Sequence, residues 1–285
     1  MTLPQRLLTV VLSLLATSTS GCLMGVVTSH NLWTSRAEEK LPLDAATLTA
    51  MEVATQDGSV VFEACPDDSA DAYVLASKRG GGWSPASAKA AQEAIEVYVK
   101  GDQDGQQQVG WRWKTLKRPG WSAEVSFEIH APAGISLEAR AHNGSISVSG
   151  LRGDARLKSE NGGIHVDAGG GTLSAEAHNG GINATYAGEE LALVSYNGRV
   201  QADVSACSSL KGRVVTYNGG VRLTVGPQTS VRLTCGAYNG RITCDAPVTV
   251  GELSRATLTG TLGGGDGQLV LRSYNGSVRI QKASG

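Results

Sequence analysis

The sequence has few of the features that identify an enzyme or a nucleic-acid-binding protein. Its 285 residues include 25 Lys and Arg against 26 Asp and Glu, so the chain has no excess of positive charge with which to bind a phosphate backbone. The signatures His-Glu-x-x-His, Cys-x-x-Cys and Gly-x-Ser-x-Gly are absent, which removes common patterns of zinc proteases, redox or zinc modules and serine hydrolases. We therefore predict a non-enzyme with no catalytic residue, no metal, no cofactor and no nucleic-acid partner.

Large aromatic residues are scarce and unevenly distributed. Both Phe and four of the five Trp lie within residues 47–136, and neither residue type occurs after residue 136. A wide β-sandwich needs large side chains to fill its core, whereas the second half of this chain offers Leu, Ile and Val alternating with Ala, Ser, Thr and Gly. The second half is therefore expected to have a narrow, thin core.

What the second half does contain is a repeat. A short phrase that ends in Asn-Gly returns seven times, and its asparagines are Asn143, Asn161, Asn179, Asn197, Asn218, Asn239 and Asn275. The gaps between them are 18, 18, 18, 21, 21 and 36 residues, and the last gap reads as two periods of 18. A fixed period near 20 residues is typical of repeat architectures, in which each unit buries its apolar face only by stacking on its neighbours.

Apolar residues alternate on both sides of each Asn-Gly. In the first unit Leu137, Ala139 and Ala141 precede the asparagine, and Ile146 and Val148 follow it. Period-two alternation indicates strands with one buried face, and Asn-Gly tolerates the positive φ of a sharp corner. Each unit is thus predicted to be a strand, a tight corner and a second strand.

Two architectures fit this unit. Asn-Gly could close antiparallel hairpins in a meander or sandwich, or form the corner of a β-solenoid with parallel stacked coils. The second is favoured because the residue before Asn recurs in kind, as expected where equivalent positions stack ~4.8 Å apart; these residues are His142, Glu160, His178, Tyr196, Tyr217, Tyr238 and Tyr274. We predict an all-β fold in which residues 137–285 form a β-solenoid of coils of 18–21 residues.

The N-terminal segment has the pattern of an export signal. Residues 1–21 contain one Arg near the start and an apolar run from Leu7 to Ala16, too short to span a membrane as a helix. The following Cys22 ends a Thr-Ser-Gly-Cys sequence that resembles the lipobox of bacterial lipoproteins, with Thr19 in place of the usual Leu. This resemblance implies a lipid on Cys22; the alternative is ordinary cleavage near Ser18 to Gly21. Residues 22–46 lack clear periodicity and are predicted to be a tether.

Residues 47–136 are predicted to be a β-rich cap on the N-terminal end of the repeats, because an open stack of coils leaves unpaired backbone at its ends. Ser84, Pro85 and the Ala-rich residues after them indicate one short helix that ends near Glu93. Strands are expected at Ala50–Ala54, Ser59–Ala64, Tyr73–Ser77, Ile95–Lys100, Gly110–Trp113 and Ala123–Ala131.

From about Thr47 to Lys282 the chain resembles the bacterial putative-adhesin family of β-strand-repeat domains. The resemblance rests on the lead-in ending in VSFEIHAPAG and on the repeated NG-[IV]-x-[VA] units. It implies an exported protein of the cell envelope, at the outer membrane or cell surface, with a solenoid fold, and it brings no catalytic residues with it.

The expected function is a non-catalytic, envelope-anchored scaffold or adhesin-like binding module, whose partners are a membrane, through the lipid, and an envelope glycan or protein. The expected ligand face combines aromatic rings with guanidinium groups beside the corners: Tyr196, Tyr217, Tyr238, Tyr274, Arg199, Arg222, Arg241 and Arg279. The alternatives are a carbohydrate-active β-helix enzyme and a self-assembling structural protein of the cell surface. For the tyrosines, a purely structural stacking role is the competing interpretation.

Two smaller groups of residues complete the predictions. His142, Glu160 and His178 share one slot in successive units and are expected to form a solvated stack with an ion pair rather than a metal site. Cys235 lies four residues before Asn239 and Cys244 five residues after it, so across a two-residue hairpin they would face each other, which predicts a disulfide in an oxidising compartment. The alternative is that both are small core residues, and the pairing of Cys65 and Cys207 is left open.

The lipid at Cys22 can be tested directly. We expect the mature protein to begin at Cys22 with lipid attached, because the export signal ends there in small residues. Mass spectrometry of the mature N-terminus measures this, and an unmodified start at any other residue would contradict it.

Overall fold

The computed structural model describes residues 33–65 and 72–283, which belong to one compact unit. The predicted signal peptide, the lipid site at Cys22 and residues 23–32 of the predicted tether lie outside the described residues. Within the described ranges, no helix is both long and apolar enough to cross a bilayer.

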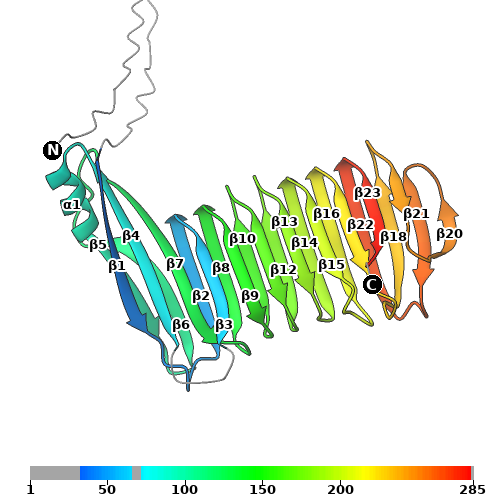
Figure 1. The fold of residues 1–285 in the computed structure, drawn as a ribbon, viewed down its shortest axis with the longest axis horizontal. Helices are drawn as coiled ribbons and strands as arrows, with labels where there is room; N and C mark the ends of the chain where they lie inside the picture. The colour runs from blue at the N-terminus through cyan, green and yellow to red at the C-terminus, as the bar shows by residue number, and fades with distance from the viewer. Residues whose placement is uncertain (1–32, 66–71, 284–285) are drawn as a thin grey trace, which may run out of the picture. The chain divides into compact units, whose positions relative to one another are not determined.

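The described chain folds into two large mixed sheets that share a core, which confirms the all-β class (Figure 1). Sheet A contains, in spatial order, β1 (Trp33–Pro42), β4 (Tyr73–Gly82), β7 (Ser122–Pro132), β3 (Val60–Cys65), β9 (Ile146–Leu151), β11 (Ile164–Ala168), β13 (Ile182–Tyr186), β15 (Val200–Val204), β17 (Val221–Val225), β23 (Val278–Lys282) and β19 (Ile242–Cys244). Sheet B contains β20 (Thr249–Leu253), β21 (Thr257–Leu262), β18 (Val231–Ala237), β22 (Gly267–Asn275), β16 (Lys211–Asn218), β14 (Glu190–Asn197), β12 (Thr172–Ala177), β10 (Ala155–Ser159), β8 (Ser136–Asn143), β2 (Ala50–Asp57), β6 (Gln106–Trp113) and β5 (Ile95–Gly101).

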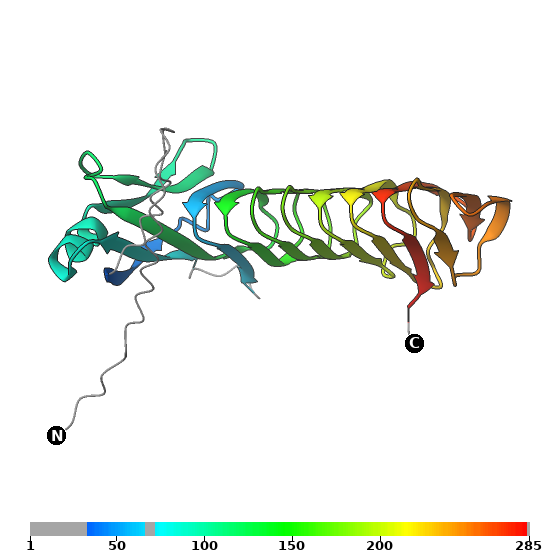
Figure 2. The same cartoon turned by 90° about the horizontal axis from the view of Figure 1, so that it is seen from above.

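Each repeat gives one strand to each sheet. Leu137 in β8 pairs with Ala155 in β10, which pairs with Leu173 in β12, and all of these ladders are parallel. The Asn-Gly links therefore join strands on different sheets and do not close antiparallel hairpins. Seen from above, successive links line up along the row of repeats (Figure 2). Equivalent residues of successive repeats consequently lie side by side.

The core between the sheets is built from the alternating positions that the sequence indicates. Leu137, Ala139, Ile146 and Val148 are all buried, and so are their counterparts in the following repeats apart from Gly212 and Cys244, which are half-buried. Each repeat buries its apolar side chains only when its neighbours cover them, and burial contributes roughly 25 cal/mol per Å² of apolar surface.

The corners are joined by a ladder of asparagine side chains. The Nδ2 of Asn161 donates to Oδ1 of Asn143 at 2.9 Å, and the Nδ2 of Asn179 donates to Oδ1 of Asn161 at 2.8 Å. The same bond repeats at 2.8–2.9 Å through Asn197, Asn218, Asn275 and Asn239. A carboxamide has one donor end and one acceptor end, so each side chain can both donate and accept along the stack.

The corner glycines are required by crowding, which differs from the sequence-based expectation of positive φ. Among the seven repeat corners, φ is positive only at Gly276. A Cβ on Gly162 would lie 2.1 Å from the carbonyl oxygen of Gly144, and one on Gly180 would lie 2.1 Å from that of Gly162. Glycine is therefore needed because the backbone of each corner rests directly on the backbone of the next.

Buried hydroxyl groups support several corners from inside. Ser195 Oγ donates to the Gly180 carbonyl at 2.9 Å, and Thr216 Oγ1 donates to the Gly198 carbonyl at 2.8 Å. Both side chains are completely buried, and a buried hydroxyl needs such a partner. Ser or Thr occupies the position two before the corner Asn in four of the seven repeats, and Ser159 and Ser273 donate to a corner carbonyl in the same way.

The last repeat is inserted out of sequence order. Strand β22 lies between β16 and β18, and β23 lies between β17 and β19. The 36-residue gap before Asn275 is therefore not two further coils, as its length suggests. Residues 249–262 form β20 and β21, which pair antiparallel with each other; β21 also pairs antiparallel with β18, so the two strands cover the end of sheet B. Every coil of a parallel stack offers the same backbone hydrogen-bonding groups at its edge. The spacing of the repeats in the sequence therefore cannot tell which coil lies next to which.

The N-terminal region confirms the six predicted strands and the helix α1 (Pro85–Glu93), whose N-cap Ser84 accepts a bond from Ser87 N at 3.1 Å. Stacking begins before residue 137, because β2 pairs in parallel with β8, and Asp57-Gly58 forms a first corner with Asp57 accepting from Asn143 at 2.7 Å.

The predicted tether is wrong for residues 33–42, which form β1 and pair antiparallel with β4. This edge strand is nowhere fully buried. Its half-buried positions include Ser35 and Glu39, so apolar periodicity did not reveal it.

The crowding at the corners can be measured. We expect Gly180→Ala to lower the free energy of unfolding by ~1–3 kcal/mol, because its methyl group would force two corner backbones apart. Gly236→Ala is the control, since a Cβ at Gly236 meets nothing within 4 Å. Urea unfolding of both variants measures the difference, and equal stabilities would contradict close approach as the reason for glycine.

Candidate functional site

The outward-facing side of sheet B from β2 to β18, here called the B face, is a regular array of rows. Parallel registered pairing places the residue before each corner Asn next to its counterpart. In spatial order the row reads His142, Glu160, His178, Tyr196, Tyr217, Tyr274 and Tyr238. The row is therefore charged toward the N-terminal end and aromatic toward the C-terminal end.

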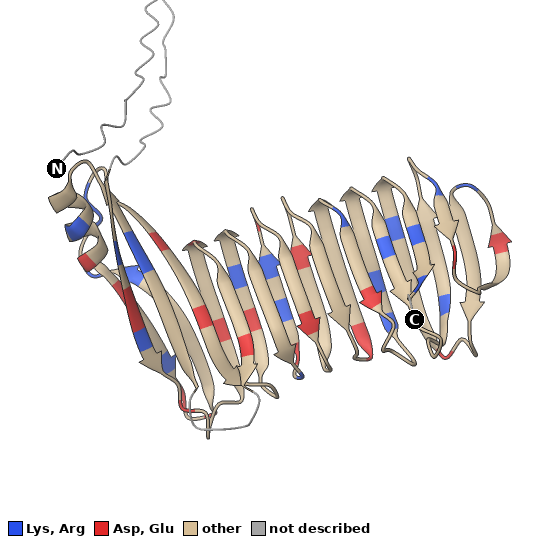
Figure 3. Cartoon of the chain, viewed as in Figure 1, with Lys and Arg blue, Asp and Glu red and all other residues tan. Residues whose placement is uncertain are grey.

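Charged side chains gather where β2, β8, β10 and β12 lie side by side (Figure 3). Arg140 contacts both Glu138 and Glu52, with 3.4 Å to the latter. Lys158 lies 3.4 Å from Glu160. Exposed pairs of this kind each contribute ~0–1 kcal/mol. Their main effect is to present both signs of charge in alternation on one flat surface.

The predicted stack of His142, Glu160 and His178 forms only in part. The two ring nitrogens of His178 each lie 2.9 Å from a carboxylate, that of Glu160 on one side and that of Glu176 on the other. The hydrogen bond from His178 lowers the pKa of Glu176, and the charge of Lys158 adds to this. Within the described ranges, no group of three or more His, Cys, Asp and Glu side chains is arranged to hold a metal ion.

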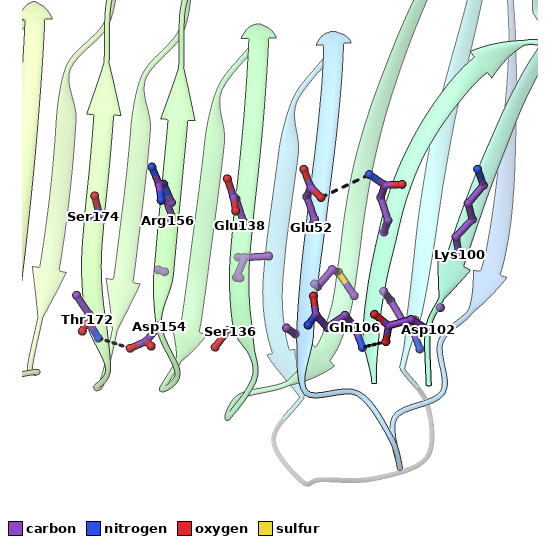
Figure 4. Close-up of a pocket in the computed structure, with 17 residues that line it drawn as sticks. Glu52, Lys100, Asp102, Gln106, Ser136, Glu138, Asp154, Arg156, Thr172 and Ser174 are labelled. Carbon is purple, nitrogen blue, oxygen red and sulfur yellow. Dashed lines mark hydrogen bonds between the residues drawn. The ribbon is translucent and has the colours of Figure 1, made fainter. Parts of the chain in front are cut away.

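A groove of about 730 Å³ lies on the B face near its N-terminal end (Figure 4). One wall comes from β5, β6 and the turn between them, which lie out of line with the row of repeats (Figure 2). The floor comes from the outward positions of β2, β8, β10 and β12. The labelled side chains of the lining are Glu52, Lys100, Asp102, Gln106, Ser136, Glu138, Asp154, Arg156, Thr172 and Ser174. The groove thus offers both hydrogen-bond donors and hydrogen-bond acceptors, and its charged side chains include both carboxylates and cations.

The groove also brings together two carboxylates that are distant in sequence. Glu52 and Glu138 are direct partners in the β2–β8 ladder, and both contact Arg140. Sequence analysis missed this pair because Glu52 lies outside the Asn-Gly repeats. The sequence signal that could have revealed it is Asp57-Gly58, which stands in the place of an Asn-Gly corner at the end of β2.

Four tyrosine rings form a continuous stack on the same face. Ring centroids lie 5.0 Å apart for Tyr196 and Tyr217, 4.8 Å for Tyr217 and Tyr274, and 5.0 Å for Tyr274 and Tyr238, with planes within 4° of parallel. Each internal ring therefore covers the faces of its neighbours. The structural role of the stack is evident, and the internal rings offer a ligand only their edges and hydroxyl groups.

The terminal ring, Tyr238, differs from the others. It is 68% exposed, whereas Tyr196 and Tyr217 are 38% and 39% exposed. Beside it is a hollow of about 280 Å³ lined by Gly236, Arg272, Thr234 and Thr257. Gly236 creates this space, because a side chain there would project into the open hollow. One open ring face, one guanidinium group and several hydroxyl groups converge here, and we call this place the Tyr238 hollow.

The predicted arginines do not share the tyrosine face. Arg222 in β17 and Arg279 in β23 project outward from sheet A, and Arg279 pairs with Asp245 at 3.0 Å. Arg199 borders a separate hollow on sheet A beside His165. Arg241 follows the corner toward β19, again on the sheet A side.

The error arose from counting outward positions across the corner. The chain passes from sheet B to sheet A at each corner. An outward-facing side chain before the corner therefore points in the opposite direction to an outward-facing side chain after it. Arg213 and Arg272 do lie on the B face beside the tyrosines, and they precede Tyr217 and Tyr274 by four and two residues.

Cys235 and Cys244 are thiols in the structure and no bond joins them. They lie on β18 and β19, which belong to different sheets, so the hairpin geometry behind the predicted disulfide is not present. Burial, with a smaller contribution from Cys244, raises the pKa of Cys235 to about 12. Burial likewise raises the pKa of Cys207 to about 11, and its Sγ donates to the Tyr186 carbonyl at 3.2 Å.

Comparison with family models and with curated proteins found no match in either case. Three solved structures are similar in fold over most of this chain. One, described as a putative adhesin from Bacteroides fragilis, has 11% identity and a TM-score of 0.46, covering 86% of this chain and 97% of its own.

The second is described as a putative adhesin from Parabacteroides merdae, with 9% identity and a TM-score of 0.43, covering 88% of this chain and 97% of its own. The third, described as a putative cell adhesion protein from Clostridium sporogenes, has 11% identity and a TM-score of 0.37, covering 87% and 100% respectively. Similarities at this level do not indicate what the present chain binds.

Thiol chemistry tests the burial of the cysteines. With a pKa of about 12, only about one Cys235 thiol in ten thousand is ionised at pH 8, so we expect alkylation to spare Cys235 and Cys207 in the folded protein. Both should react after unfolding in urea, as read by peptide mass spectrometry. Two fewer reactive thiols in the unfolded, unreduced sample than in the reduced one would instead establish the Cys235–Cys244 bridge.

The same shifts predict a pH dependence of stability. Because folding raises the pKa of Cys235 from 9.0 to about 12, its contribution to stability is full below pH 9 and is lost as the pH rises toward 12.

Proposed function

We propose that this protein is a non-catalytic binding module, anchored in the cell envelope through Cys22, that holds an extended polar polymer along the B face of a β-solenoid. Envelope glycans are the class of ligand that fits this face best. The protein acts as a rigid support, because its corners fix the spacing of every row, and the ligand is recognised by side chains that repeat at that spacing.

The solenoid is supported by the parallel, registered pairing of successive repeats and by the asparagine ladder. Export and lipid anchoring are supported by the sequence of the first 22 residues. Placement in the outer membrane or at the cell surface follows from these proposals.

The observation that carries the binding proposal is the Tyr238 hollow. An aromatic ring face binds the apolar face of a sugar with little loss of side-chain entropy, and a guanidinium group donates directional hydrogen bonds to hydroxyl or carboxylate oxygens. Both are present within one hollow, where Tyr238 is 68% exposed and Arg272 forms part of the lining. Stacking covers the equivalent ring faces of Tyr217 and Tyr274.

The groove of Figure 4 extends the same surface toward the other end of the stack. Its lining alternates carboxylate, guanidinium, amide and hydroxyl groups, which suits a polymer with many hydroxyl groups. A ligand that occupies both places would lie across the rows of β8 to β16, whose outward side chains are mainly polar but include Val194, Val215 and the edges of the stacked tyrosines.

A carbohydrate-active enzyme is the second candidate, favoured by the adjacent Glu52 and Glu138. Glycoside hydrolysis needs one carboxyl that is protonated and one that is ionised. Here both are bound to Arg140, so the pair is better suited to contact a ligand than to transfer a proton. Product analysis decides between the two: a hydrolase would release shorter saccharides, and Glu138→Gln would abolish the release.

A binding screen against envelope glycans and peptidoglycan fragments tests the proposal. With a ligand found, we expect Gly236→Val to weaken binding at least tenfold, because its side chain fills the Tyr238 hollow without meeting the fold. Tyr238→Ser should weaken binding similarly, because it removes the open ring face. Isothermal titration gives the affinities, and thermal unfolding checks that both variants remain folded.

Arg222→Ala is the matched control, since it removes a guanidinium group from the same stack of repeats on the opposite sheet. Unchanged affinity in Gly236→Val, or an equal loss in Arg222→Ala, would rule out the Tyr238 hollow as the binding site.

A further inference from the structure

The turn between β6 and β7, residues 114–121, presents an apolar side chain surrounded by positive charge. Leu116 at its tip is 93% exposed, the highest exposure among the large hydrophobic residues that protrude from the described surface. Lys114, Lys117 and Arg118 on either side of it are all exposed. A single exposed leucine is ordinary on a protein surface, so the residues around it decide whether this turn is a contact site.

This turn is held firmly from below. Trp121 is buried against Ala91 and Ala94 near the end of α1, and its Nε1 donates to Ser87 Oγ at 3.2 Å. The Arg118 guanidinium lies 5.2 Å from the Trp121 ring. The backbone is tied as well, with Lys114 N donating to the Ala94 carbonyl at 2.8 Å. Leu116 therefore remains exposed because the turn cannot fold inward to bury it.

Two further aromatic side chains extend the apolar surface. Trp83 packs beside the turn, where a Cβ on Gly120 would meet its indole nitrogen, yet it is 52% exposed. Trp33 is 51% exposed and lies in β1 opposite Gly82, directly before Trp83. Trp33, Trp83 and Leu116 are thus three exposed apolar side chains at the end of the stack where the described chain begins.

The positive charge of this surface is balanced only in part: the pKa of Glu96 is lowered mainly by its hydrogen bond with Arg112 and to a smaller extent by the charge of Lys114. Among the described residues, the ion pairs include none with Lys114, Lys117 or Arg118; Lys114 Nζ instead donates to the Glu93 backbone carbonyl at 3.1 Å. The carboxylates nearby already have partners, since Glu93 lies 3.8 Å from Lys89 and Glu96 lies 2.7 Å from Arg112.

We propose that Leu116, Trp33, Trp83 and the three cations form a contact surface for an anionic lipid bilayer. Tryptophan and leucine insert at the boundary between headgroups and acyl chains, while Lys and Arg bind anionic headgroups. The position in the chain fits this occupant: Cys22 and Trp33 are separated by eleven residue steps, at most about 40 Å of extended chain. A lipid on Cys22 would keep this end of the fold within reach of the bilayer.

The consequence is a defined orientation. With its N-terminal end resting on the membrane, the stack of repeats would stand away from the bilayer and present the Tyr238 hollow at its far end. The apolar and cationic contact would add to the attachment that a lipid on Cys22 provides and would restrict how the fold tilts on the bilayer. The membrane contact is independent of the polymer proposed for the B face.

Vesicle sedimentation of the mature chain carrying Cys22→Ser tests the surface without any lipid anchor. We expect it to bind vesicles of phosphatidylglycerol and phosphatidylcholine and to bind pure phosphatidylcholine at least fivefold less. Added salt should weaken binding, because screening shortens the reach of the cations. Leu116→Ser and Lys117→Glu should each reduce the bound fraction at least fivefold, and thermal unfolding checks that both variants remain folded.

Leu253→Ser and Lys282→Glu serve as matched controls, because they change an exposed leucine and an exposed lysine in the C-terminal part of the chain. Gly236→Val should bind vesicles like the parent, which separates this test from that of the B face. Absence of vesicle binding, or equal losses in variants and controls, would overturn the proposal. So would a dimer in size-exclusion chromatography that Leu116→Ser dissociates, if vesicles are not bound.

Discussion

The close contact between successive corners is the constraint on which the rest of this structure depends. At each corner a carboxamide donates to the one before it, and a glycine lets two backbones approach to a distance that no Cβ would permit. Together these contacts fix the register of every coil on its neighbour. The rows of the B face, including the tyrosine stack, exist because that register is the same throughout.

A ladder of this kind is uniform in its interior and changes only at its ends. Asp57 begins the ladder with a carboxylate that accepts a hydrogen bond from Asn143. A carboxylate has no N–H group, so it cannot donate to a further residue, and the ladder stops at this end. Asn239 forms the other end, donating to Asn275. The distinctive surfaces of the protein lie at these ends. The groove forms where β5 and β6 depart from the row, and the Tyr238 hollow forms where the ring stack stops.

The inserted C-terminal coil decides which tyrosine is open. In chain order Tyr274 would be the last ring, but β22 lies between β16 and β18, so Tyr274 is covered on both faces by Tyr217 and Tyr238. The antiparallel pair β20 and β21 then covers the edge of β18 and leaves Tyr238 exposed beside Gly236. The order of the coils therefore determines where an aromatic ring can meet a ligand.

The sequence by itself determined the helix, the repeat and the strands other than edge strands such as β1, because these follow from local properties: an N-capping serine, a recurring corner dipeptide and period-two alternation. It also indicated the rows, since residues at equal distances from Asn-Gly must be equivalent in a registered stack.

Only the tertiary structure decided the order of the coils, the membership of Asp57 in the ladder, and the separation of the tyrosines from Arg199, Arg222, Arg241 and Arg279. The reason is physical. Parallel coils have interchangeable edges, so their order carries no local signature. In addition, each corner moves the chain from sheet B to sheet A. The outward-facing side chains that follow a corner therefore lie on the opposite surface of the protein from those that precede it.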